Sequence, residues 1–267
     1  MSLPYFQKGI NRRIGDEIGM TAILKYYKEK LGEKILYLDN NKFIQAKSFF
    51  PEGLVEFVDK EPEQFTWLHE HNIWIFTPFL RDLGIYTELR KEWMYKQDEK
   101  KDLDVVFVPL VGVDYNIIRN FDVKFCYDLM FEIYKKFPNS TMIIDRMKLS
   151  LFPMNYLKLP ITVSSNIHET FINIQKSKIY IGGDTGTSHF AGACRHPKLL
   201  LLYGDNQKNA YKWESQRKQM GEILKEPKLL ENPKYNWDST PCCDPIRMEV
   251  LTLKDNKYPI DKIMESL

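Results

Sequence analysis

The fold is decided by the sequence Ile179-Tyr180-Ile181-Gly182-Gly183-Asp184-Thr185-Gly186-Thr187-Ser188-His189. A short apolar strand runs into two glycines and then into residues that open a helix. In a parallel α/β sheet, the N–H groups at such a helix start bind phosphate groups. Gly186 leaves the backbone open to a pyrophosphate, and the hydroxyls of Thr185, Thr187 and Ser188 add hydrogen-bond donors. The sequence therefore predicts a phosphate-binding turn. A plain strand-to-helix turn with Asp184 as its N-cap fits the same spacing.

Short strands and helices alternate on both sides of this turn. In the first part, a helix with an apolar face over 20–31 ends at Gly32, and apolar strands are predicted at 35–38, 54–58 and 73–76. In the second part, strands are predicted at 105–110, 141–144, 179–181 and 199–203, and helices at 122–137, 168–175, 185–194 and from Pro259 onward. The charged run at 96–104 separates the two parts. We therefore predict an α/β protein with domains at 1–100 and 101–267.

The composition excludes several classes of protein. The 267 residues are 43% hydrophobic and 28% charged, which is ordinary for a globular protein. The longest apolar run, 199–203, is too short to cross a membrane, and the first residues have no signal-peptide core. A net charge of +2 does not indicate a general nucleic-acid surface, and the four cysteines form neither a disulfide framework nor a zinc pattern. We therefore expect a cytoplasmic protein without a transmembrane segment.

Residues 182–193 resemble the strand-end signature of the heptosyltransferases, which form family 9 of the glycosyltransferases. That signature runs Gly-x-Asp-Thr-Gly-x-x-His and is followed by small residues, here Ala191, Gly192 and Ala193. Three further segments are similar to family motifs and stand in family order: Gly15-Asp16 before a helix, Leu200-Leu201-Leu202-Tyr203-Gly204 after the signature, and Ser239-Thr240-Pro241-Cys242 late in the chain. The resemblance spans nearly the whole sequence.

The resemblance implies a GT-B architecture, in which two Rossmann-like lobes face each other across a cleft. Residues 1–100 would form a reduced acceptor lobe with the catalytic loop, and residues 101–267 the nucleotide-sugar donor lobe. The implied reaction transfers a sugar from a nucleoside-diphosphate sugar to an acceptor hydroxyl, with inversion and without a cofactor or an obligatory metal. The acceptor would be a bacterial surface glycan or a glycolipid similar to lipopolysaccharide, which also fits a position at the inner face of the membrane.

The same resemblance assigns roles to individual residues. Asp16 would be the catalytic base, although its position also fits an N-cap. Arg119 would pair with the diphosphate, and Arg12 and Arg13 would meet the acceptor or be solvated. The remaining donor-binding residues would be Gly183, Asp184, Thr185, Gly186, Thr187, Ser188 and His189.

Other functions fit parts of the sequence. The reduced first lobe and the arginine pair also fit a phage-type enzyme that glycosylates hydroxymethylated DNA bases, which would need a basic groove. A non-catalytic protein that binds nucleotide sugars would keep the same turn. Asp102-Leu103-Asp104 has the form of an Asp-x-Asp metal motif, but it lies in a charged run before a strand, where solvated side chains are usual. A dinucleotide-dependent oxidoreductase is disfavoured because no strand precedes Gly-x-Gly-x-x-Gly.

Overall fold

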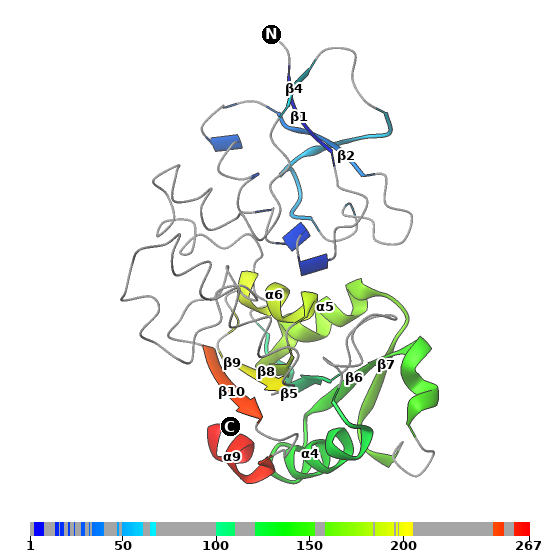
Figure 1. Cartoon of the computed structure of the whole chain (residues 1–267), viewed down its shortest axis with the longest axis vertical. Helices are drawn as coiled ribbons and strands as arrows, with labels where there is room; N and C mark the ends of the chain where they lie inside the picture. The colour runs from blue at the N-terminus through cyan, green and yellow to red at the C-terminus, as the bar shows by residue number, and fades with distance from the viewer. Residues whose placement is uncertain are drawn as a thin grey trace. The chain divides into compact units, whose positions relative to one another are not determined.

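The computed structural model of the chain divides into two compact units, Met1–Lys96 and Gln97–Leu267, and each contains its own parallel sheet (Figure 1). The predicted α/β class is confirmed. The arrangement of two lobes across a cleft, and the acceptor and donor roles of 1–100 and 101–267, stay predictions. The structure describes residues 3–7, 14–15, 17–18, 21, 24, 28–29, 32, 34–39, 47, 50–60, 65–67, 100–109, 121–152, 158–183, 185–194, 196, 198–204, 248–253 and 259–267.

The first unit contains a four-stranded sheet in the order β3-β2-β1-β4. Its strands are β1 (Leu3–Gln7), β2 (Leu36–Leu38), β3 (Glu56–Val58) and β4 (Phe65–Trp67). The described residues between 14 and 29 are helical, and Gly32 follows them with a φ of 64°. Its N–H donates to the Lys28 carbonyl at 2.9 Å. This left-handed glycine closes the helix, as the sequence predicts, because glycine carries no steric cost there.

The second unit contains a six-stranded sheet in the order β10-β9-β8-β5-β6-β7, with every pair parallel. Its strands are β5 (Leu103–Val108), β6 (Thr141–Asp145), β7 (Ile161–Ser164), β8 (Ser177–Gly182), β9 (Leu199–Gly204) and β10 (Met248–Leu253). Counted along the chain from β5, the strands lie in the order 3-2-1-4-5-6, which is the order of a doubly wound nucleotide-binding sheet. The strand order reverses between β5 and β8.

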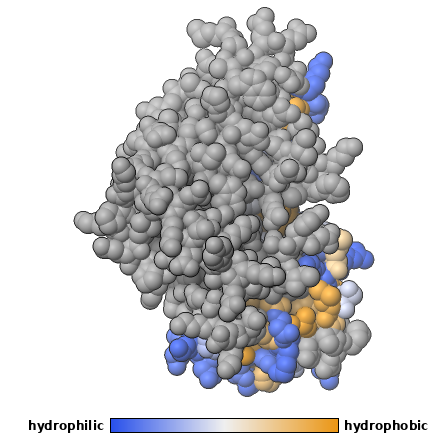
Figure 2. Space-filling view, in the orientation of Figure 1, coloured by the Kyte–Doolittle hydropathy of each residue, from blue (hydrophilic) through white to orange (hydrophobic). Residues whose placement is uncertain are grey.

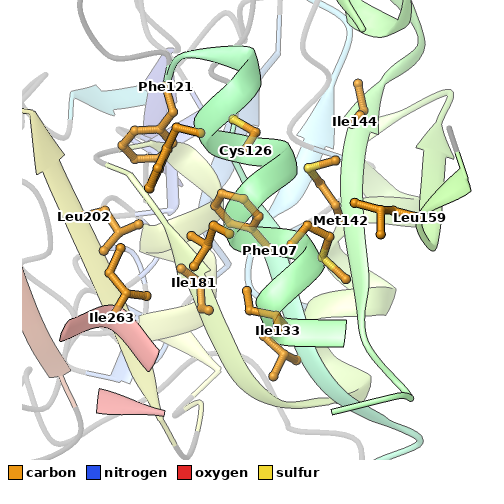
Figure 3. Packing of buried hydrophobic residues seen from close by; sticks show 14 of the residues in the cluster. Phe107, Phe121, Cys126, Ile133, Met142, Ile144, Leu159, Ile181, Leu202 and Ile263 are labelled. Carbon is orange, nitrogen blue, oxygen red and sulfur yellow. The ribbon is translucent and has the colours of Figure 1, made fainter. Parts of the chain in front are cut away.

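Helices cover both faces of this sheet (Figure 1). They are α4 (Val123–Lys136), α5 (Ile167–Lys176), α6 (Gly186–Ala193) and α9 (Ile260–Ser266), with a 3₁₀ helix η3 at Arg146–Leu151. On one face, α4 and α9 pack over a core that includes Phe107, Ile181 and Leu202 (Figure 3). On the other face, α5 and α6 contact each other through the stacked rings of Phe171 and Phe190, with centroids 3.7 Å apart. Because side chains alternate along a strand, Tyr180 points to the face opposite Ile181.

The boundaries of α4 show why the local sequence predicts this helix well. The Asp122 carboxylate accepts a hydrogen bond from the Phe125 N–H at 3.1 Å and so caps the first turn. Lys135 and Lys136 lie in the last turn, where positive charge is favourable. The predicted range 122–137 therefore matches the observed helix together with its two caps.

Four strands were not predicted from the sequence. β1 contains Pro4, which is unusual within a sheet. β7 and β10 are edge strands, and β4 pairs with β1. Each of them depends on a neighbouring strand more than on its own pattern. The predicted strand at 73–76 lies outside the described residues.

The described surface of the second unit mixes apolar and hydrophilic residues (Figure 2). Its exposed large apolar side chains belong to α4, η3, β7 and α5: Phe131, Tyr134, Met147, Leu151, Val163 and Ile172. No helix within the described ranges is long and apolar enough to cross a membrane. The exposed apolar side chains therefore do not single out the turn after β8.

Candidate functional site

The turn after β8 lies at the point where the strand order reverses. β5 and β8 are neighbours, and Val108 at the end of β5 pairs with Gly182 at the end of β8. From β5 the chain continues into α4 and β6, whereas from β8 it continues into α6 and β9 on the opposite side. The two connections lead to opposite sides of the reversal point, and the carboxyl ends of the strands at such a point are where ligands of doubly wound sheets bind. The topology thus puts Gly183 and residues 185–188 at the expected ligand position.

Gly182 is required by its neighbour Tyr180 rather than by its own backbone conformation. Among the described glycines, a left-handed φ is found at Gly32 and Gly53 and not at Gly182. A Cβ atom at position 182 would lie 2.3 Å from Tyr180 Oη and 2.7 Å from Cζ. The Tyr180 side chain is fully buried and two residues earlier on the same strand face, so it occupies the space that a larger residue would need.

The Tyr180 hydroxyl connects β8 to the start of α6. Its Oη lies 2.8 Å from Thr187 Oγ1 and 3.1 Å from Ser188 Oγ. Thr187 Oγ1 lies 2.6 Å from Thr185 Oγ1, and Ser188 Oγ donates to the Gly183 carbonyl oxygen. All four of these side chains are buried.

The direction of these hydrogen bonds follows from counting protons, because each hydroxyl has one proton to donate. The Ser188 proton goes to the Gly183 carbonyl, so Tyr180 must donate to Ser188. Thr187 must then donate to Tyr180, and Thr185 to Thr187. The chain of donation runs Thr185 to Thr187 to Tyr180 to Ser188 to the Gly183 carbonyl. The hydroxyls predicted to donate to a phosphate thus donate within the loop.

The main chain at the start of α6 remains suited to a phosphate. A helix start has N–H groups with no acceptor inside the helix, and it carries a partial positive charge. The Ser188 N–H donates to the Thr185 carbonyl at 3.1 Å, while Gly186 and Thr187 are the first two residues of the helix. Any phosphate at this loop would therefore meet main-chain N–H groups of 186 and 187.

His196 is another buried polar residue, and no pattern in the sequence points to it. Its ring has no exposed surface, its Nε2 lies 2.9 Å from Ser177 Oγ, and its Nδ1 lies 2.9 Å from the Lys198 carbonyl oxygen. Burial, aided by the charge of Lys101 and opposed by the hydrogen bond to the Lys198 carbonyl, lowers the pKa of His196 to about 4. Ser177 starts β8, so His196 lies at the edge of the sheet opposite the turn and supports the fold rather than the site.

Asp102 and Asp104 also lie at that opposite edge. Asp102 precedes β5 and pairs with Lys100 at 3.3 Å, and Asp104 pairs with Lys178 at 2.7 Å. Within the described ranges, no three His, Cys, Asp or Glu side chains are grouped to hold a metal ion. The two aspartates of the Asp-x-Asp sequence therefore lie at the opposite end of the strands from the turn after β8.

The first unit also contains a buried carboxyl that the sequence did not reveal. Glu17, next to the predicted base Asp16, is fully buried, and the Tyr37 hydroxyl donates to its Oε2. Tyr37 packs edge-on against Phe50 and Phe57, with ring centroids 5.1 and 5.6 Å away. A glutamate near the start of a helix is normally solvated, so only the tertiary contacts show that the Glu17 carboxyl is buried.

Several predicted site residues lie outside the described part of the chain. They are Asp16, Arg12, Arg13, Arg119, Asp184 and the late Pro241-Cys242 segment. The His189 backbone lies in α6, and its side chain is outside what the structure describes. The structure therefore brings together Gly183, Thr185, Gly186, Thr187 and Ser188 between the end of β8 and the first turn of α6.

Comparison with solved structures identifies the fold. A family 9 glycosyltransferase from Veillonella parvula DSM 2008 aligns with a TM-score of 0.55 and 12% identity, over 98% of this chain and 88% of that one. The E. coli heptosyltransferase WaaC with ADP aligns with a TM-score of 0.54 and 9% identity, over 100% of both chains. The fold is that of these glycosyltransferases.

The same E. coli enzyme with ADP-2-deoxy-2-fluoro heptose aligns with a TM-score of 0.52 and 9% identity, over 99% of this chain and 98% of that one. No protein-family model matches the sequence, and no curated protein matches it. The predicted resemblance to the heptosyltransferases is thereby confirmed at the level of the fold.

Proposed function

We propose that the chain is a glycosyltransferase that moves a sugar from a nucleoside-diphosphate sugar to an acceptor hydroxyl. The observation that carries this proposal is the turn 182–188 at the reversal point of a 3-2-1-4-5-6 sheet. The likeness to enzymes whose solved structures contain ADP or an ADP-heptose analogue supports it. The sequence motifs around Asp16 and Asp184 support the same class.

The second unit would bind the donor through the start of α6. The diphosphate would accept hydrogen bonds from main-chain N–H groups near Gly186, where the helix contributes partial positive charge. Arg119 would add a planar guanidinium that matches phosphate oxygens. Two sources of positive charge would stabilise the leaving diphosphate, so the proposed reaction has no obligatory metal.

The first unit would supply the base. The Asp16 carboxylate would take the proton of the acceptor hydroxyl while the acceptor oxygen forms a bond to the anomeric carbon. The bond from that carbon to the diphosphate oxygen would break on the opposite face, and the nucleoside diphosphate would leave with the electron pair. Attack opposite the leaving group inverts the configuration. A bacterial surface glycan or glycolipid, met at the inner face of the membrane, is the acceptor we propose.

A thermal-shift screen of nucleoside diphosphates and their sugars tests donor binding. A ligand at about 100 times its Kd stabilises the folded state by about 2.7 kcal/mol. For a unit of this size, that raises Tm by roughly 5 to 10 °C. The absence of a shift with every ADP, GDP, UDP, CDP and dTDP compound would overturn the proposal.

The Asp16→Asn variant tests catalysis separately from binding. The amide keeps the shape of the carboxylate but cannot accept the acceptor proton. We expect an unchanged thermal shift with the donor and a fall in turnover of at least about 100-fold. Unchanged turnover would remove Asp16 from the mechanism. Donor binding by the wild type without transfer to any acceptor would indicate a non-catalytic nucleotide-sugar-binding protein.

A further inference from the structure

Tyr180 Oη is the central atom in the series of hydrogen-bonded hydroxyls at the start of α6. This oxygen accepts a hydrogen bond from the Thr187 hydroxyl, and its own hydroxyl donates one to Ser188 Oγ. Tyr180 therefore joins the two threonine hydroxyls to the Ser188 hydroxyl. Both partners belong to the first turn of α6, whereas the tyrosine ring is held in the sheet with no exposed surface. The Tyr180 side chain thereby links the sheet to the first turn of the helix.

The last hydrogen bond of this series fixes the direction of the Gly183 carbonyl. Ser188 Oγ donates to the Gly183 carbonyl oxygen, so this carbonyl points into the loop. A carbonyl oxygen directed at a diphosphate would repel it, whereas N–H groups attract it. Hydrogen bonds in a chain also polarise and strengthen one another. Removing the Tyr180 hydroxyl would weaken the Ser188 bond and leave Thr187 without its acceptor.

We propose that Tyr180 is a positioning residue for the donor site. Its hydroxyl holds Gly183 and residues 185–188 in the conformation in which main-chain N–H groups, and not the threonine and serine hydroxyls, meet the diphosphate. The proposal rests on the proposed function for the identity of the ligand. Its claim about the loop concerns the ligand-free protein and can be tested independently.

Hydrogen exchange on the full-length, ligand-free protein tests the loop. Tyr180→Phe keeps the buried ring and removes only the hydroxyl. Ser177→Ala is the matched control, because it removes another buried hydroxyl from the same strand at the opposite edge of the sheet. We expect amides at 183–188 to exchange about tenfold faster in Tyr180→Phe, the size expected for one buried hydrogen bond, and at the wild-type rate in Ser177→Ala.

Titration with ADP, GDP, UDP, CDP and dTDP tests the consequence for binding. Tyr180→Phe should raise the Kd of the nucleoside diphosphate that the wild type binds by about tenfold, whereas Ser177→Ala should leave it unchanged. Should Tyr180→Phe not fold, Thr187→Val interrupts the same chain one step earlier and carries the same expectation.

The outcomes separate the two proposals. The positioning role would be overturned if the loop amides of Tyr180→Phe exchanged no faster than those of Ser177→Ala. It would also be overturned if exchange in Tyr180→Phe were faster by the same factor throughout the second unit. A looser loop with an unchanged Kd would overturn it as well. A wild type that binds none of the five nucleoside diphosphates would overturn the proposed function, while hydrogen exchange would still decide whether Tyr180 holds the loop.

Discussion

Acidification should destabilise the second unit through the buried ring of His196. In the unfolded chain, a histidine has a pKa of about 6.5, whereas burial lowers the pKa of His196 in the folded protein to about 4. At a pH between these two pKa values, His196 is mostly protonated in the unfolded state and mostly neutral in the folded state. The free energy of unfolding is therefore unaffected above pH 6.5 and falls as the pH drops from 6.5 toward 4.

The size of this effect follows from the shift. A difference of one pKa unit corresponds to about 1.4 kcal/mol, so the change from 6.5 to about 4 amounts to about 3 kcal/mol. That is a large part of the stability of a typical domain. At pH 4.5 most of the loss, about 2.5 kcal/mol, should already be present.

Urea unfolding followed by circular dichroism at pH 7.0 and 4.5 measures the loss. Carboxylates elsewhere also titrate in this range, so the comparison is with His196→Asn, which keeps polar atoms in the cavity but does not titrate. The wild type should lose about 2.5 kcal/mol more than the variant. Equal losses in the two proteins would refute the reasoning. An imidazole NMR titration of the wild type with a midpoint above pH 6 would refute it directly.

Three further perturbations test other parts of the second unit. Gly182→Ala should cost roughly 1 to 3 kcal/mol in urea unfolding because its Cβ meets the Tyr180 ring, and the same Gly182→Ala change should cost less in a Tyr180→Val background. Cys126 and Cys194 should resist a disulfide thiol reagent at pH 8 until the protein unfolds, as peptide mapping by mass spectrometry would show, because burial raises the pKa of both thiols. Asp122→Ala should cost about 1 kcal/mol by removing the cap of α4, whereas Asp122→Asn should cost less. Rapid labelling of either cysteine in the native state, or equal stabilities of the two Asp122 variants, would contradict these expectations.

Local sequence signals were sufficient to predict the helices whose start and stop residues lie within the helix or directly beside it. The helix at 122–137 has a capping aspartate, an apolar stripe and Pro138 just beyond it, and it was predicted to within its caps. Gly32 was predicted as a helix stop and is left-handed in the structure. Such signals act within a few residues and survive without knowledge of the rest of the chain.

Strands at the edges of the sheets depended on their partners. β7 has two apolar residues, of which Ile161 is partly buried and Val163 is exposed, so its sequence resembles a loop. It becomes a strand because β6 offers a ladder from Met142 to Asp145. Pairing between distant segments is not encoded in a short window, which explains why this strand was missed.

The sequence by itself determined the α/β class, the limits of the main helices and the turn at 182–189, because periodicity, caps and glycines are properties of neighbouring residues. The tertiary structure alone decided the strand order and so put that turn at the reversal point between β5 and β8. It also decided the direction of the hydroxyl chain and the burial of His196 and Glu17. The acceptors around a hydroxyl decide the direction of its hydrogen bond, and the residues that pack over a side chain decide how far it is buried. Both depend on residues that only folding brings together.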